Sequence, residues 1–238
     1  MSITVEIAVQ DAAGAALAIA GGADRLELCQ ALEMGGITPS LGILESVFAA
    51  VDPALVNVLV RPRGGGFVYD ADEVAVVAAD IAACVARGAG GVVVGALDAD
   101  GGLDRDTLRR WRDAAAGATV TFHRAIDAAA DPAAVFDALL AEDVDRVLTS
   151  GGAPRSVDGI PALRDFVERA AGTLEVQAGG GVQPGDIAAL RAAGVDAVHL
   201  SARTRAGSAS PSGPGGGATG HDATSAAIVA AAVAAARG

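Results

Sequence analysis

Gly22-Ala-Asp-Arg-Leu-Glu-Leu-Cys29, followed by Met34-Gly-Gly-Ile-Thr-Pro-Ser40, decides the fold. The first stretch predicts a short apolar strand that ends in polar atoms, and the second predicts a glycine-rich loop that leads into a helix. Side chains alternate along a strand, so the two leucines face one way while Glu27 and Cys29 face the other. A buried carboxylate and thiol are costly without partners, so we expect polar groups from other strands to meet them.

The same order of strand, loop and helix recurs seven more times along the 238 residues. The predicted strands span residues 3–9, 24–29, 55–61, 91–97, 118–123, 145–150, 173–178 and 196–201. The predicted helices span residues 11–20, 40–50, 71–87, 104–116, 132–142, 157–171, 184–193 and 222–236. Eight such units in one series predict a single α/β domain over residues 1–238, a TIM-like (β/α)8 barrel. A doubly wound sheet is the alternative, but it rarely uses eight evenly spaced parallel strands.

Local signals agree with this division. Asp11, Asp104, Asp131 and Asp222 are each placed to cap the start of a helix. A weak repeat also precedes three of the even-numbered strands: Gly22-Ala-Asp-Arg-Leu, Asp143-Val-Asp-Arg-Val and Gly194-Val-Asp-Ala-Val. Residues 206–220 interrupt the pattern, because they are rich in Gly, Ser and Pro, and they predict a flexible insertion in the loop after the eighth strand.

Composition excludes several classes of function. Hydrophobic residues make up 52% of the chain, which suffices for a core, and the formal net charge of −12 argues against nucleic acid and anionic membranes. No apolar run reaches the roughly 18 residues of a membrane span, and the N-terminus shows no signal peptide, so we expect a soluble cytoplasmic protein. All 17 basic residues other than histidine are arginines. Without lysine, Schiff-base chemistry is excluded.

The faces of the strands that point into the barrel carry many polar residues. Barrel interiors are normally apolar, and polar groups concentrate at the carboxyl ends of the strands, where active sites lie. The set predicts a functional mouth, although a hydrogen-bonded network that only fixes register is the alternative. The predicted inward residues are Glu6, Glu27, Cys29, Asn57, Arg61, Thr121, His123, Glu175, Gln177, His199 and Ser201.

Three loops suit an anion. Loops after the seventh and eighth strands form the usual phosphate site of this fold, where glycine lets backbone N–H groups approach closely. Two guanidiniums beside a glycine run after the third strand suit a carboxylate or phosphate clamp. The candidate anion ligands are Arg61, Arg63, Gly179, Gly180, Gly181, Ser201 and Arg203.

Acid–base and metal-binding residues overlap in this pattern. Glu27, His123 and Asp127 are candidates for proton transfer, because a histidine among carboxylates can exchange protons. Cys29, His123 and His199 are soft or borderline donors that suit copper or zinc. A histidine that only satisfies hydrogen bonds inside the core is the structural alternative.

Seven motifs give the chain a family resemblance. They occupy residues 22–29, 35–42, 60–65, 95–101, 121–127, 146–152 and 199–203, and they include Val-Arg-Pro-Arg-Gly-Gly and Thr-Phe-His-Arg-Ala-Ile-Asp. In this order, over nearly all of residues 1–205, they resemble the copper homeostasis protein CutC family. A departure follows the eighth strand, where Ser208-Ala-Ser-Pro-Ser-Gly-Pro-Gly-Gly-Gly217 replaces a loop that is often ordered in the family.

The resemblance implies a cytoplasmic TIM-like barrel, often a homodimer, with a name linked to copper. Two functions stay open. The first is copper binding, with Cys29 as the soft ligand assisted by His123 or His199. The second is an isomerase or lyase for a small phosphorylated or carboxylated metabolite. The residues that carry the resemblance are Glu27, Cys29, Arg61, Arg63, Asp98, His123, Arg124, Asp127, Ser150, His199 and Ser201.

Overall fold

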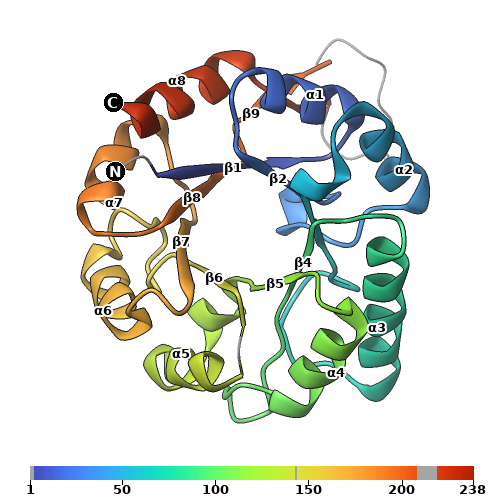
Figure 1. Cartoon of the computed structure of the whole chain (residues 1–238), viewed down its shortest axis with the longest axis vertical. Coiled ribbons are helices and arrows are strands. Elements are labelled where there is room, and N and C mark those ends of the chain that lie inside the picture. Colours follow the sequence, from blue (N-terminus) through green and yellow to red (C-terminus); the bar gives the residue numbers. More distant parts are fainter. Residues whose placement is uncertain (1–2, 143, 208–218) are drawn as a thin grey trace.

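The computed structural model describes residues 3–142, 144–207 and 219–238, and within them eight parallel strands form a closed barrel (Figure 1). The strands are β1 (Thr4–Val9), β2 (Arg25–Leu28), β3 (Val56–Leu59), β4 (Gly91–Val94), β5 (Thr119–Phe122), β6 (Arg146–Thr149), β7 (Glu175–Gly179) and β8 (Ala197–Leu200). Pairing of β1 with β8, which sets Glu6 opposite His199, closes the ring. The predicted (β/α)8 fold is confirmed, and the doubly wound alternative is wrong.

Helices surround the strands, as Figure 1 shows. They are α1 (Ala12–Ala20), α2 (Leu41–Ala50), α3 (Ala71–Val85), α4 (Arg105–Ala115), α5 (Pro132–Ala141), α6 (Ile160–Ala170), α7 (Ile187–Ala192) and α8 (Ala226–Arg237). The side chains of Asp11, Asp104 and Asp131 accept backbone N–H groups at the starts of α1, α4 and α5, as predicted. Short 3-10 turns include η1 (Leu32–Met34), η2 (Pro53–Leu55), η3 (Arg124–Ala128) and η4 (Pro184–Asp186).

The sequence repeat has a structural cause. In each copy, an aspartate just before an even-numbered strand accepts the backbone N–H of a residue near the start of the preceding strand, at 2.8 Å. This hydrogen bond joins neighbouring strands at the amino end of the barrel. Asp143 lies outside the described residues, and the aspartate that makes the bond in its copy is Asp145. The three pairs are Asp24 with Val5, Asp145 with Val120, and Asp196 with Val176.

The apolar core lies between the strands and the helices. The outward side chains of the strands are buried there, so the predicted alternation holds. They include Val5, Ile7, Leu26, Leu28, Val56, Val58, Val120, Phe122, Val176, Val198 and Leu200. Among the described residues, no helix is long and apolar enough to cross a bilayer.

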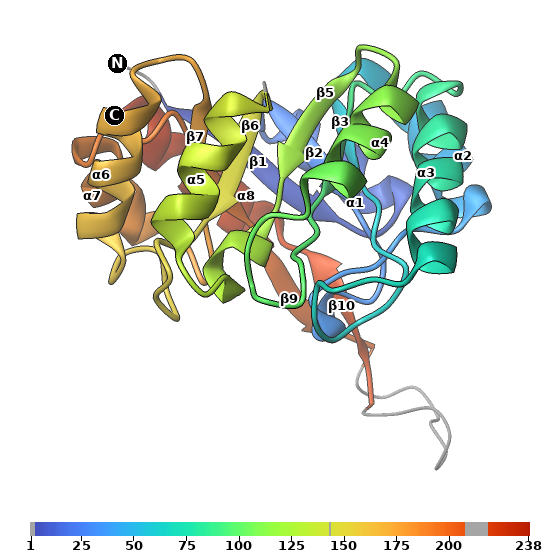
Figure 2. The same cartoon turned by 90° about the horizontal axis from the view of Figure 1, so that it is seen from below.

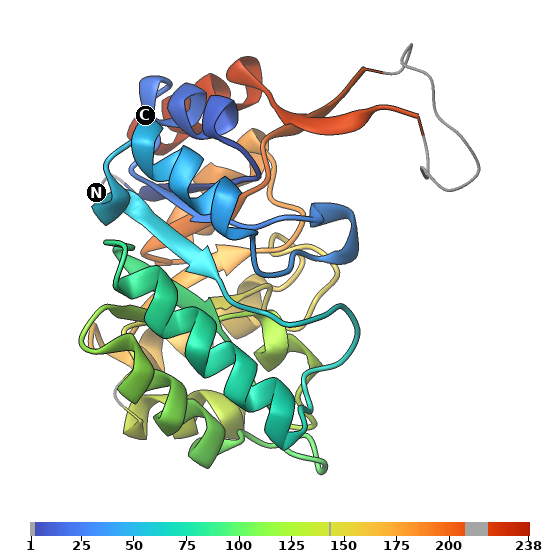
Figure 3. The same cartoon turned by 90° about the vertical axis from the view of Figure 1, so that its right-hand side faces the viewer.

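The chain after β8 differs from the prediction. Residues Arg203–Ala206 (β9) and His221–Thr224 (β10) form an antiparallel hairpin, with Asp222 opposite Arg205. The predicted helix start and cap at Asp222 are therefore wrong: its carboxylate pairs with arginines across the hairpin, and Ser225 caps α8. Figures 2 and 3 show the hairpin projecting beyond the carboxyl ends of the strands. Most of the predicted flexible loop, residues 208–218, lies outside the described residues.

Candidate active site at the carboxyl ends of the strands

Glu6 in β1 is a hydrogen-bond hub inside the barrel. Its carboxylate is 1% exposed and accepts two donors on each oxygen. Burial alone would raise the pKa of Glu6, but the hydrogen bond from His199 and the charge of Arg25 hold that pKa well below its usual range. Glu6 is therefore ionised and fully bonded. The four donors are Arg25 Nε at 2.8 Å, Asn57 Nδ2 at 3.0 Å, Gln177 Nε2 at 2.7 Å and His199 Nδ1 at 2.9 Å.

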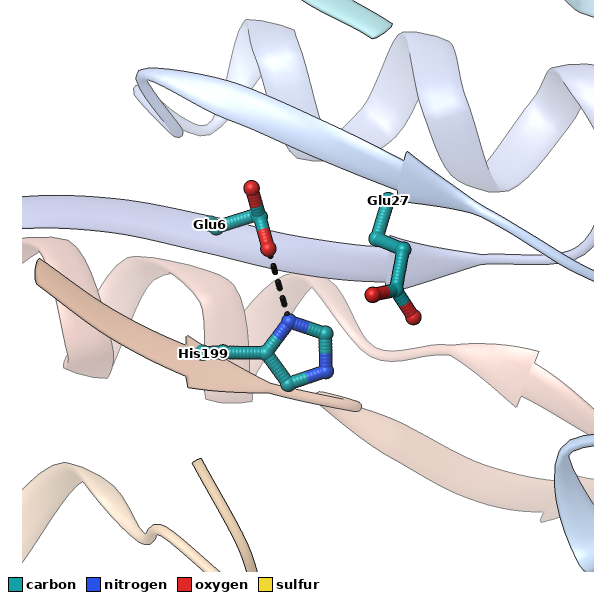
Figure 4. A group of neighbouring side chains, drawn as sticks. All are labelled: Glu6, Glu27 and His199. Carbon is teal, nitrogen blue, oxygen red and sulfur yellow. Dashed lines mark hydrogen bonds and ion pairs between the residues drawn. The ribbon is translucent and has the colours of Figure 1, made fainter. Parts of the chain in front are cut away.

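His199 in β8 has one ring nitrogen committed and one free for chemistry. Nδ1 donates to the carboxylate of Glu6, and the ring lies between Glu6 and Glu27 (Figure 4). Burial alone would lower the pKa of His199, but the charge of Glu27 and the bond to Glu6 raise it above its ordinary value. The second nitrogen, Nε2, makes no hydrogen bond to a described residue. His199 therefore holds a second proton more readily than an unperturbed histidine does.

Glu27 in β2 is the unanchored carboxyl of the site. It is 5% exposed, and no described residue donates a hydrogen bond to it. Burial raises the pKa of Glu27 to about 7; the charge of His199 opposes this rise and that of Glu6 adds to it. Oxygens of Glu6 and Glu27 and a ring nitrogen of His199 all lie within 4.8 Å of one another. A carboxyl that gains and loses its proton near neutral pH is what a general base requires.

A cavity of about 210 Å³ opens beside this pair. It lies at the carboxyl ends of the strands, where the polar inward residues predicted a functional site. Among the predicted site residues, it brings together Glu27, Arg61, His123, Gly180, Gly181, His199 and Ser201. It is also lined by Leu32, Gly35, Leu59, Phe67, Arg124, Leu148, Val182 and Leu200.

His123, directly after β5, differs from His199 in the direction of its pKa shift. Its Nδ1 accepts the backbone N–H of Ala125 at 3.1 Å, so the proton of the neutral ring sits on Nε2. Burial, helped by the charge of Arg61, lowers the pKa of His123 to about 3. The Nε2 atom is buried and has no hydrogen-bond partner among the described residues. At neutral pH His123 is an uncharged donor.

Two guanidiniums give the cavity positive charge. Arg61 donates to the backbone carbonyls of Gly36 at 3.3 Å and Gly65 at 2.6 Å, and it lies 4.9 Å from the ring centre of Phe67. Arg124 is held by Asp127 at 2.7 Å and by Ser150 at 3.1 Å. Both guanidiniums are therefore fixed before any ligand arrives, which lowers the entropy cost of binding an anion.

Asp127 supports the site from behind rather than lining the cavity. Its carboxylate accepts hydrogen bonds from the Thr149 hydroxyl at 2.5 Å and from the backbone N–H groups of Ser150 and Gly152. With these bonds it ties the loop after β5 to the loop after β6. It also accepts the Nε–H of Arg124, which orients that guanidinium. Its position favours a positioning role over the predicted role in proton transfer.

Arg63, Arg203 and Gly179 are also absent from the residues that line the cavity. Arg63 pairs with Glu73 at the start of α3, and Arg203 pairs with Asp222 in the hairpin. Gly179 serves packing, because a Cβ atom built there would lie 2.3 Å from the Leu148 side chain. The structure therefore does not bring these three predicted anion ligands to the cavity.

The residues present do not fit a copper centre built on Cys29. Its side chain is fully buried in a small apolar cluster with Leu59 and Val93. Burial raises the pKa of the thiol well above its usual value, whereas a metal ligand must be a thiolate. The close acidic group of the described residues, which holds Glu6, Glu27 and His199, includes neither Cys29 nor His123. Glu6 has no free lone pair for a metal.

Sequence reasoning missed two charged residues of the barrel interior and one aromatic wall. Arg25 bonds Glu6, Gln177 and Glu175, and the Arg146 side chain donates to Thr121. Both share the inward parity of their strands, so strict alternation could have found them. No sequence signal marked Phe67, which reaches the cavity from the loop after β3.

Comparisons with known proteins place the chain in a family. A family model described as the CutC family matches residues 3–204. The chain is 44% identical over 200 residues (84% of this chain and 83% of the relative) to the family protein CutC of Xanthomonas axonopodis pv. citri (strain 306). To the family protein CutC of Xylella fastidiosa (strain Temecula1 / ATCC 700964) it is 42% identical over 205 residues, 86% of this chain and 76% of the relative.

One solved structure gives the same assignment, and a second shares the fold. The crystal structure of a candidate copper homeostasis protein CutC from Streptococcus agalactiae superposes with a TM-score of 0.74 at 27% identity, covering 84% of this chain and 98% of that chain. A structure named native KDPGal has a TM-score of 0.59 at 20% identity, covers 100% of this chain and 95% of that chain, and shares the fold alone. The family match and the relatives together show that the chain belongs to the CutC family.

Proposed function

We propose that this chain is an enzyme that binds a small anionic metabolite at the barrel mouth and moves a proton on it. The observation that carries the proposal is the pairing, in one cavity, of Glu27 and His199 with the guanidiniums of Arg61 and Arg124. Glu27 exchanges the proton, because the pKa of its carboxyl, raised by burial to about 7, matches neutral conditions. The arginines hold the anionic group of the substrate.

The size of the cavity limits the substrate. A volume of about 210 Å³ corresponds to about seven water molecules at liquid density. Such a space suits a metabolite of a few carbons with one carboxylate or phosphate group. Isomerase or lyase chemistry fits better than Schiff-base chemistry, since the chain has no lysine.

The anion half of the proposal is tested with a matched pair of arginine variants. Arg124 and Arg63 are similarly exposed, at 42% and 43% of the side chain, and each pairs with a carboxylate. Only Arg124 lines the cavity. In calorimetric titrations with inorganic phosphate and with oxalate, we expect wild type and Arg63→Gln to bind alike. Arg124→Gln should bind at least tenfold more weakly, a loss of about 1.4 kcal/mol. Equal binding by all three proteins would overturn the proposal.

Copper binding is the second candidate, because the Streptococcus agalactiae relative is described as a candidate copper homeostasis protein. The cluster of Glu6, Glu27 and His199 offers two carboxylates and an imidazole, although the bonds already made by Glu6 count against it. Titration with Cu(I) against a competing chelator compares wild type with Cys29→Ser. Binding tighter than about micromolar, near −8 kcal/mol, that is lost in the variant would support copper handling. Binding that the substitution leaves unchanged would exclude Cys29 as the anchor.

A cytoplasmic location and a homodimer remain proposals from the family resemblance. Subcellular fractionation tests the location. Sedimentation equilibrium tests the assembly, and a homodimer predicts twice the chain mass of 23.2 kDa.

A further inference from the structure

Two hydrogen-bond donors of the cavity wall are buried. His123 Nε2 and Arg61 Nε are both inaccessible, and neither has a hydrogen-bond partner among the described residues. Both residues line the cavity. Leaving a buried N–H unpaired costs about 1–3 kcal/mol, so such groups in a native site indicate a missing acceptor. The acceptor that fits here is an oxygen atom of the ligand.

The His123 donor is fixed as a neutral one. Its Nδ1 is occupied by the Ala125 N–H, so only Nε2 carries a proton. Burial and the nearby charge of Arg61 keep the pKa of this histidine at about 3. At neutral pH the ring is therefore uncharged and carries a single proton, on Nε2. Phe67, with its ring centre 5.0 Å from that of His123, covers the imidazole. A fixed donor in a dry site stabilises an oxygen on which negative charge develops during a reaction.

Glu27 supplies the complementary group. It lines the same cavity, accepts no hydrogen bond from a described residue, and stands beside His199. A base, an uncharged donor and a guanidinium pair thus surround a space for only a few carbons. A ligand that satisfies all of them has an acidic C–H bond, an adjacent carbonyl oxygen and an anionic end.

We propose that the substrate is a small anionic carbonyl compound, and that the enzyme moves a proton on the carbon next to the carbonyl group while His123 Nε2–H holds the carbonyl oxygen. This inference rests on the proposed function and adds the class of substrate and the type of reaction. His123 touches the reacting oxygen and is therefore a catalytic residue in this scheme.

The step balances without a further reactant. The Glu27 carboxylate takes the proton from carbon, and the electrons of the broken C–H bond form a carbon–carbon double bond. The π electrons of the carbonyl group move onto oxygen, which accepts the hydrogen bond from His123; the imidazole keeps its proton. Return of the proton from Glu27 to the same carbon restores the carbonyl group, so no oxidant or reductant is needed.

The experiment follows hydrogen–deuterium exchange in D2O by proton NMR. The probes are pyruvate, which joins a carbonyl group to a carboxylate, and dihydroxyacetone phosphate, which joins one to a phosphate. We expect wild type to speed exchange at the carbon beside the carbonyl of at least one probe tenfold or more over buffer. Glu27→Gln should abolish the effect, and His123→Leu should lower it 100-fold to 1000-fold, as loss of a single oxyanion donor does. His221→Gln, which changes an exposed histidine of the hairpin, is the matched control.

The outcomes separate the two levels of the proposal. If phosphate or oxalate binds through Arg124 but neither probe exchanges above buffer, the carbonyl inference is overturned and the anion site stands. If no anion binds, the proposed function falls and this inference falls with it. Exchange that His123→Leu leaves unchanged would overturn the role of His123.

A measurement on the wild type guards against misfolding of the His123 variant. With 15N-labelled histidine, His123 should remain neutral with its proton on Nε2 from pH 5 to 9, both free and with saturating oxalate. The Nε2 proton resonance should move downfield on binding, because the oxalate oxygen accepts its hydrogen bond. A doubly protonated ring, or a resonance that oxalate does not move, would overturn the proposal.

Discussion

At the scale of single residues, two histidines on one cavity have pKa values shifted in opposite directions. His199 donates to an ionised carboxylate and stands beside another, so its pKa rises despite burial. His123 meets burial and the charge of Arg61, so its pKa falls to about 3. Surroundings rather than residue type therefore assign the histidines to proton holding and to hydrogen-bond donation.

The coupling of His199 to Glu27 gives a first prediction. In Glu27→Gln the pKa of His199 should fall, because the charge of Glu27 is the largest of the influences that raise it. The measurement is an NMR titration of the histidine side chains, with the His199 resonance identified by substitution. Glu45→Gln, which removes a carboxylate exposed on α2, is the control and should leave the pKa in place. A His199 pKa that does not move in Glu27→Gln would contradict the coupling.

Glu27 also predicts a pH dependence of stability. Its folded-state pKa of about 7 lies above the value of 4.5 for an unperturbed glutamate, so its protonated form is favoured by folding. That contribution is fully present below pH 4.5 and is lost as the pH rises through about 7. It amounts to at most about 3 kcal/mol. The free energy of unfolding, measured by urea titration across this range, should fall less steeply with pH in Glu27→Gln than in wild type. If the free energy of unfolding fell equally with pH in both proteins, the raised pKa of Glu27 would be refuted.

Side-chain alternation along the strands placed Glu6, Glu27, Asn57 and His199 inside the barrel from sequence alone. The pattern could not predict which carboxylate would be ionised. Glu6 differs from Glu27 because donors from β2, β3, β7 and β8 all reach it, and β7 and β8 lie near the other end of the sequence. Pairings of this kind follow from barrel closure, which local pattern does not encode.

At the scale of elements, capping aspartates correctly predicted where three helices begin. Asp11, Asp104 and Asp131 capped their helices as predicted. Asp222 has a similar sequence context, but it lies in β10, where its carboxylate pairs with Arg203 and Arg205 of the opposite strand. An aspartate therefore predicts a cap only where no opposing strand supplies a cation.

Two glycines of different elements give an element-scale prediction. A Cβ atom at Gly42, in α2, would meet no atom within 4 Å, whereas one at Gly91, in β4, would lie 2.7 Å from the backbone oxygen of Thr119. Gly42→Ala should stabilise the protein by up to about 1 kcal/mol, because alanine favours helix. Gly91→Ala should destabilise it by about 1–3 kcal/mol, as overpacking does. Thermal unfolding of both variants checks the pair; a change of the same sign in both would contradict the packing described.

At the scale of the whole molecule, the Glu6 hub joins five of the eight barrel strands. Its own strand β1 is linked through side chains to β2, β3, β7 and β8. Arg25 extends the network to Glu175 at 2.5 Å. The polar interior therefore also holds the barrel in register, so the register-fixing alternative accounts for this deep layer and the cavity lies above it.

Removing the charge of the hub should destabilise the barrel. Glu6→Gln removes the fully buried carboxylate of Arg25, leaves it only the more exposed Glu175, and puts an amide where two donors need acceptors. We expect a loss of about 3–5 kcal/mol, as for other buried pairs broken on one side. Urea unfolding measures the loss, and Glu73→Gln, at the exposed pair with Arg63, should cost about 1 kcal/mol or less. Equal losses in the two variants would show that Glu6 is not a hub.

Glu6 both accepts the hydrogen bond of His199 and links the strands, so it tolerates fewer substitutions than residues outside its network. A mutation of Glu6 that alters the pKa of His199 also weakens the hydrogen bonds that join the strands. Selection for folding therefore opposes such a mutation. Phe67, which reaches the cavity from the loop after β3, takes no part in the hydrogen bonds of Glu6. Proteins that evolve from this one should therefore differ in the ligands they bind and keep the hydrogen-bond network of Glu6 unchanged.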